Sequence, residues 1–145
     1  MINATGTEKF AIVATVDPDA LTAATHSSDG VDLSLFESVS FIFMAGTLGS
    51  SATVDVVVKS GSDNSTFGNT VDTATQLTQA GTDSDKQIIM NVRGDDLTGG
   101  DRYARAEVTV GTATSDGALI ALGHNPKHSP ASDNDLSTVD EIRNA

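Results

Sequence analysis

Short runs in which apolar and polar residues alternate recur along this chain of 145 residues, and they restrict it to folds built from sheets. A period of two is typical of a strand that buries one face and exposes the other. The alternation is clearest in Thr53–Lys59 and Arg102–Val110, where valines and alanines occupy every second position. Each of these runs therefore predicts a half-buried strand.

Further runs complete the expected sheet framework. Strands are predicted at Phe10–Val16, Ser38–Met44, Thr73–Leu77, Lys86–Arg93 and Ala118–Leu122. Turn residues separate them every 8–12 residues, a spacing typical of antiparallel sandwiches. The sequence therefore predicts an all-β protein: an antiparallel β-sandwich, jelly-roll-like, of about eight strands with little helix.

Two details of this framework are more specific. Asp17-Pro18-Asp19 is expected to end the first strand, and Ala20–Gly30 then forms either a single helical turn or a loop. Ser38–Met44 and Ala118–Leu122 are apolar on both faces, and Ile89 lies opposite the apolar face of its own run. A strand that is apolar on both faces is central or covered by a partner, so we expect a homo-oligomer.

The composition changes near residue 124, which sets the expected domain boundary. Residues 1–124 form the sandwich domain, with residues 1–9 as an N-terminal arm, and 125–145 form an extended C-terminal tail. Three apolar residues stand out in that polar tail: Leu136, Val139 and Ile142. Such a segment is either disordered or an arm whose apolar residues dock on a neighbouring subunit or on a larger assembly.

Charge and cysteine content exclude several classes of function. The chain carries 20 acidic and 8 basic residues, a net charge of −12, which repels nucleic acid and anionic membranes. It has no cysteine, which excludes disulfides, thiolate zinc sites and cysteine nucleophiles. The apolar run Phe10–Val16 is too short for a signal core or a membrane span. We therefore expect neither a nucleic-acid nor a membrane partner.

No set of residues has the spacing of a catalytic, cofactor or metal site. Pro126 separates His124 from His128 and prevents the helical turn that would align them on a zinc ion. The Asp-rich loops lack the glycine and glutamate of a helical calcium loop, which leaves only adventitious surface calcium. Glu107 shares a face with Arg105, which suggests a charge pair rather than a catalytic acid. The sequence predicts a non-enzymatic protein without cofactors.

The remaining hypothesis is that the protein acts by binding another molecule through its surface. Tyr103, Arg105 and Glu107 occupy one face of a predicted strand, and tyrosine and arginine are enriched at subunit interfaces. The alternative is that the two sheets of one chain cover these surfaces by themselves. Both alternatives stay open at this point.

Several strand motifs resemble those of a known group of proteins. They are Val31-Asp32-Leu33, Phe36-Glu37-Ser38-Val39 with Phe41 and Gly46, Asp101-Arg102-Tyr103-Ala104-Arg105 leading into Val108-Thr109-Val110, and Ala118-Leu119-Ile120-Ala121-Leu122-Gly123 with Pro126 and Pro130. Over residues 10–130 the chain looks like the small proteins encoded beside the capsid genes of tailed bacteriophages. Ala104 departs from the larger hydrophobic residue usual at that position.

The resemblance implies a capsid decoration or cement protein. Such a protein sits on the outer surface of the virion, binds the major capsid protein and often forms a trimer; no catalytic residues come with the family. The alternative from another class is a carbohydrate- or host-surface-binding module with its site on a loop such as Gly94–Asp101. The absence of Trp and the single Tyr argue against aromatic sugar platforms.

Overall fold

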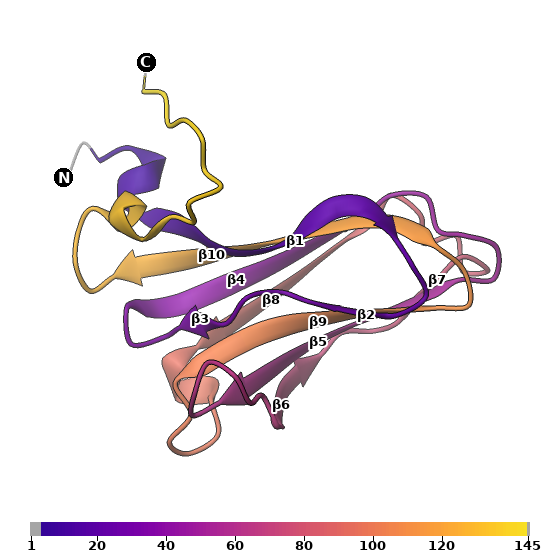
Figure 1. Ribbon diagram of the computed structural model, residues 1–145, viewed down its shortest axis with the longest axis horizontal. Coiled ribbons are helices and arrows are strands. Elements are labelled where there is room, and N and C mark those ends of the chain that lie inside the picture. The colour runs from indigo at the N-terminus through magenta and orange to yellow at the C-terminus, as the bar shows by residue number, and fades with distance from the viewer. Residues whose placement is uncertain (1–3, 145) are drawn as a thin grey trace.

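A computed structural model describes residues 4–144 and consists of two antiparallel sheets packed face to face (Figure 1). Sheet A contains, in spatial order, β1 (Phe10–Leu21), β10 (Ser115–Pro126), β4 (Phe36–Ala45) and β8 (Gln87–Arg93). Sheet B contains β2 (Thr25–Ser27), β9 (Tyr103–Gly111), β5 (Thr53–Gly61) and β6 (Asn69–Thr73). Two short strands extend sheet B: β3 (Val31–Asp32) beside β9 and β7 (Leu77–Thr78) beside β5.

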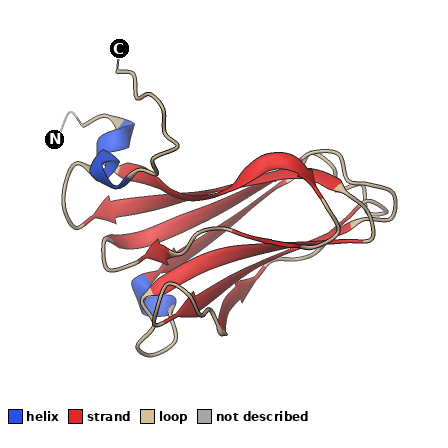
Figure 2. Cartoon of the chain, in the orientation of Figure 1, coloured by secondary structure: helices blue, strands red, loops and turns tan. Residues whose placement is uncertain are grey.

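Strands account for almost all of the regular structure (Figure 2). The described residues contain no α-helix, only the 3₁₀ turns η1 (Gly6–Glu8), η2 (Gly94–Asp96) and η3 (Ala131–Asn134). Among residues 4–144 there is accordingly no helix with the length and apolarity that a membrane crossing needs. The all-β prediction is confirmed.

Strands from the two ends of the chain pair with each other, and strands nearer the middle pair inside them. β1 pairs with β10, β2 with β9, β4 with β8 and β5 with β6. β10 also pairs with β4, and β9 with β5, which joins the four pairs into two sheets. Eight strands arranged in this way form a jelly roll, so the predicted architecture is confirmed at the level of topology.

The core lies between the sheets and follows the predicted alternation. β9 buries Ala104, Ala106, Val108 and Val110, and β5 buries Val54, Val56 and Val58. Sheet A contributes the bulkier residues, including Phe36, Phe41 and Phe43, each no more than 2% exposed. Small residues on one layer and aromatic residues on the other fill the space between two sheets about 10 Å apart.

The first strand is longer than expected, because the prediction that Asp17-Pro18-Asp19 ends it is wrong. β1 continues to Leu21, and its register against β10 shifts between Val16 and Asp19. Proline cannot donate to a ladder, but it is tolerated at bulges of edge strands. β1 is the edge strand of sheet A, so Pro18 interrupts nothing. The following segment contains β2 and no helical turn.

The C-terminal segment first packs on the sandwich and then leaves it. β10 includes Asn125 and Pro126, and Ala131 of η3 is fully buried. The N–H of Leu136 donates to the Ile12 carbonyl at 2.8 Å, and the N–H of Ile12 donates to Asp135 Oδ1 at 2.6 Å. These bonds cover part of the free edge of β1. Beyond them the chain extends away from the body of the sandwich (Figure 1).

The packing of Phe36 on Gly123 gives a direct test of this core. A Cβ on Gly123 would lie 2.8 Å from the Phe36 ring, so Gly123→Ala should destabilise the fold by about 1–3 kcal/mol through overpacking. Gly99→Ala is the matched control, since nothing lies within 4 Å of its added Cβ. Urea unfolding measures both variants. Equal midpoints for Gly123→Ala and the wild type would contradict this packing.

Candidate functional site

The outward side chains of β4, β8 and β10 form an open, largely apolar surface, here named the outer A face. Ile42 pairs with Ile89 on one side and with Ile120 on the other, so the three side chains form one cross-strand row. Ile89 is 62% exposed and Met44 is 53% exposed. The remaining members of the outer A face are polar or small side chains and one leucine: Ser38, Ser40, Gln87, Asn91, Arg93, Asp116, Ala118, Leu122 and His124.

This surface explains why two strands are apolar on both sides. Their inward residues belong to the core, whereas Ile42 and Ile120 face outward and are half-buried beside the exposed Ile89. Contiguous exposed apolar residues of this kind mark interaction sites. The expectation that a partner covers them therefore stays a prediction with a defined location.

Carboxylates are absent from the centre of the outer A face and lie at its end, where Asp116 of β10 borders a hollow with Met44. Its outward positions within 38–44, 87–93 and 118–124 hold no Asp or Glu, although the chain has 20 of them. Next to the isoleucine row, the Ser40 hydroxyl donates to Asn91 Oδ1 at 2.6 Å and lies 3.0 Å from His124 Nε2. The surface thus combines an apolar centre with a small polar margin.

The predicted interface residues on β9 lie on the outward side of sheet B. Glu107 accepts hydrogen bonds from Arg105 at 2.6 Å and from Lys59 of β5 at 2.7 Å. The Arg105 guanidinium lies 4.5 Å from the centre of the Phe67 ring, within the range of a cation–π contact. The sequence placed Tyr103, Arg105 and Glu107 on one face but missed Lys59 and Phe67.

The electrostatics of Glu107 favour an ion pair over acid catalysis. Burial raises the pKa of Glu107, but the hydrogen bonds from Lys59 and Arg105 outweigh burial and hold that pKa below its usual range. A general acid at neutral pH needs the opposite shift. Glu107 is therefore the ionised centre of a charge network on sheet B.

A second ion pair fastens β3 to β9. Arg102 donates to both carboxylate oxygens of Asp32, with Nε at 2.7 Å from Oδ1. The hydrogen bond from Arg102 is the main reason that the pKa of Asp32 falls to about 2. The same guanidinium lies 5.2 Å from the centre of the Tyr103 ring. The cation next to Tyr103 is thus Arg102, which is already paired with Asp32.

The predicted tail residues lie near the N-terminal part of the chain: Leu136 borders a hollow between β1 and β2, and Ile142 borders one beside η1 and Pro130. Leu136 and Val139 are half-buried, and Ile142 is 40% exposed. Only Leu136 is fixed to the sandwich by a backbone bond to β1. Docking of these side chains on a neighbour stays a prediction.

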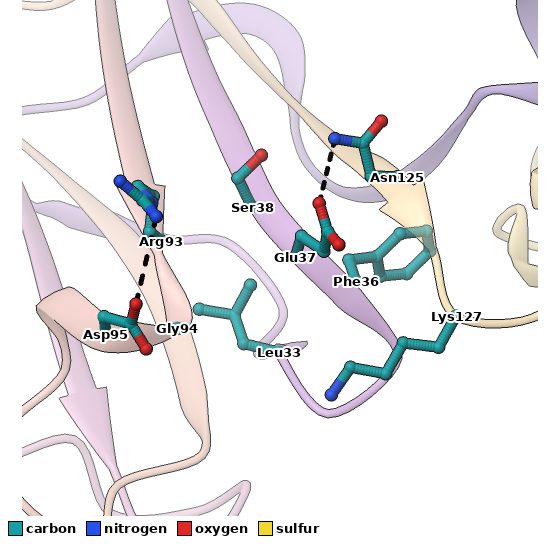
Figure 3. A pocket seen from close by; sticks show the side chains of 9 residues that line it. All are labelled: Leu33, Phe36, Glu37, Ser38, Arg93, Gly94, Asp95, Asn125 and Lys127. Atoms are coloured by element: carbon teal, nitrogen blue, oxygen red, sulfur yellow. Dashed lines mark hydrogen bonds and ion pairs between the residues drawn. The ribbon is translucent and has the colours of Figure 1, made fainter.

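A hollow of about 560 Å³ opens at the end of the sandwich where β4, β8 and β10 meet η2 (Figure 3). Asn125 Nδ2 donates to Glu37 Oε2 at 3.1 Å across it, and Arg93 lies 3.9 Å from Asp95 at its rim. Lys127 also lines the hollow, and Figure 3 shows its side chain extending along it. The hollow is polar, with charges of both signs.

Metal ligation has no support from the geometry of the described chain. Within residues 4–144, no three His, Asp or Glu side chains gather closely enough to hold an ion. The aspartates of the loops bond to the backbone instead: Asp63 Oδ1 accepts from the N–H groups of Ser65 and Thr66. These aspartates stabilise turns.

Comparison with known proteins finds similar structures but no similar sequences. No family model and no curated protein matches the chain. A chain from the structure of infectious bursal disease virus Gt strain superposes on 86% of this chain with a TM-score of 0.50 and 14% identity. A chain from the structure of the Gx strain superposes on 85% of this chain with a TM-score of 0.42 and 12% identity. TmCBM61 in complex with β-1,4-galactotriose superposes on 72% of this chain with a TM-score of 0.37 and 13% identity.

These similarities concern architecture alone. This chain spans about a third of each virus chain (34% and 33%) and 67% of TmCBM61. At such identities the match to the Gt strain chain shows a shared β-sandwich fold. Any common activity or partner requires separate evidence.

The Arg102–Asp32 pair predicts a specific dependence of stability on pH. Because the folded-state pKa of Asp32 is below its unfolded value of 3.8, the pair stabilises the fold at neutral pH and loses this effect as the pH falls toward about 2. With solvent screening, Asp32→Asn should cost about 1 kcal/mol at pH 7 and much less near pH 2. Urea unfolding at both pH values measures the difference. A cost that does not depend on pH would refute this role.

Proposed function

We propose that this protein is a non-enzymatic structural component of a virion that decorates and stabilises a bacteriophage capsid, with the outer A face as its contact with the shell. The observation that carries the proposal is the outward apolar row of Ile42, Ile89 and Ile120, in which Ile89 is 62% exposed, on a chain of net charge −12. A soluble protein does not usually leave such a surface open. Its location on the outer side of a four-stranded sheet suits an extended partner.

The fold and the strand motifs support the same function independently. A jelly roll is an architecture used by viral coat domains, and the chain superposes on part of an infectious bursal disease virus chain. The resemblance of strand motifs such as Asp101–Arg105 to phage decoration proteins is the reason for proposing a bacteriophage and the outer surface of its capsid. A decoration protein binds many equivalent sites, so modest affinity per site suffices for stable coverage.

The partners follow from this proposal. The shell contact is made with the major capsid protein, and the chain assembles into a homo-oligomer. The resemblance implies a trimer. Leu136, Val139 and Ile142 of the tail dock on a neighbouring subunit or on the shell. Tyr103 and Arg105 of sheet B then lie on the side opposite the shell.

Binding to undecorated phage heads tests the shell contact. Met44 is exposed on the outer A face, and Met44→Asp should weaken head binding by about tenfold or more, because a carboxylate must lose its water there. Thr75→Asp, in the exposed segment between β6 and β7, adds the same charge on sheet B and should bind like the wild type. Copies bound per head, measured by sedimentation and quantitative gel, give both affinities. Absence of saturable binding by the wild type would reject the proposal.

The hollow of Figure 3 favours a second function, carbohydrate or host-surface binding. Its polar groups, among them Glu37, Arg93 and Asn125, are the types that bind sugar hydroxyls. If this function holds, a glycan array gives selective signals, and Asn125→Ala, which removes the amide bonded to Glu37, reduces them at least about tenfold. If decoration alone holds, neither protein gives a selective signal.

A further inference from the structure

The two edge strands of sheet A, β1 and β8, differ in how well they are protected from pairing with another chain. On β1, Pro18, two register shifts and the bonds of Asp135 and Leu136 to Ile12 protect the edge. β8 forms the other edge, pairs with β4 without a shift and contains neither proline nor carboxylate. Exposed straight edges are templates for pairing with another chain, and proteins normally protect them. β8 is thus an unprotected edge next to the outer A face.

The backbone groups available on this edge can be identified by alternation. The Lys86 carbonyl accepts from Ala45 N–H, on the side of β4, whereas Arg93 N–H donates to Asp96 Oδ2 on the opposite side. Because backbone groups alternate along a strand, those of Gln87, Ile89 and Asn91 point away from β4. No other described residue forms a backbone hydrogen bond with these groups.

We propose that β8 pairs antiparallel with β8 of a second copy of this chain across a two-fold axis at Ile89. In this register Ile89 lies opposite itself and Gln87 lies opposite Asn91 of the second copy. All three free residues on each side then form ladder pairs. A register shifted one step further would need the Arg93 N–H, which Asp96 already occupies.

The charges around β8 are compatible with this contact. Two copies with a net charge of −12 repel each other, but β8 itself contributes no carboxylate. The same register brings Arg93 of each copy to the level of Asp85 of the other, just beyond the end of the ladder. Arg93 has only a long 3.9 Å contact to Asp95 within its own chain, so it is available for this pairing.

The two-fold contact joins the outer A faces of both copies. Ile89 of each copy lies at the axis, so the isoleucine row of one copy continues into the row of the other. The resulting sheet has eight strands and one continuous apolar centre. The contact does not depend on capsid binding, and it replaces the three-fold symmetry that the resemblance implies.

Cysteine cross-linking tests the register directly, because the chain has no cysteine of its own. Directly opposed residues in a hydrogen-bonded antiparallel pair have Cα atoms about 5.5 Å apart, within the range of a disulfide. Under mild oxidation Ile89→Cys should become mainly covalent dimer. Gln87→Cys alone and Asn91→Cys alone should not, whereas an equimolar mixture of these two variants should. Equal cross-linking of all three single variants would overturn the register.

Light scattering tests the contact without cysteines. The wild type should have twice the mass of the 14.9 kDa chain at the upper end of a dilution series. Ile89→Lys places two like charges at the axis and should return the protein to the monomer with an unchanged circular dichroism spectrum. Thr75→Lys, on sheet B, should remain dimeric. A wild-type monomer or trimer throughout, or a dimer that survives Ile89→Lys, would overturn the proposal, and head binding remains a separate measurement.

Discussion

The fit of two phenylalanines of β4 over two glycines of β10 sets the geometry on which the rest of sheet A depends. Phe43 lies over Gly117 and Phe36 over Gly123, with no room for a Cβ at either glycine. A slip by one residue would move the aromatic rings onto larger side chains and turn the apolar sets to the wrong faces. β10 also pairs with β1, and β4 also pairs with β8, so this register positions all four strands of sheet A.

The sequence predicted the faces of the strands well but their partners poorly. Alternation identified the strand at Thr53–Lys59 because each side chain there has a fixed side, and β5 covers that run. It could not show that β1 pairs with β10, since the contact spans almost the entire chain. Pro18 was misread for the same reason: a proline ends a central strand but not a bulged edge, and only the topology makes β1 an edge.

The candidate surfaces show the same division. Tyr103, Arg105 and Glu107 share a face, as their spacing predicts, but the partners of Arg105 come from other segments. Phe67 is the one aromatic residue in a polar loop, and nothing local indicates that it folds back over sheet B. The outer A face was partly visible in strands that are apolar on both sides. The covering of β1 by Asp135 was not, because a tail carboxylate has no periodicity.

The distribution of apolar residues, more than that of charge, distinguishes the surfaces that another molecule can approach. The strands of both sheets carry carboxylates: Asp32, Asp55, Asp72 and Glu107 on sheet B, and Asp17, Asp19, Glu37 and Asp116 on sheet A, where β8 has none. The two sheets of a sandwich are about 10 Å apart, and charges are screened over about 8–10 Å at physiological ionic strength. Charge alone therefore does not separate the two sheets, since each carries four carboxylates on its strands. The outer A face is distinguished by its apolar row, where removal of Ile42, Ile89 and Ile120 from water supplies the attraction for a partner.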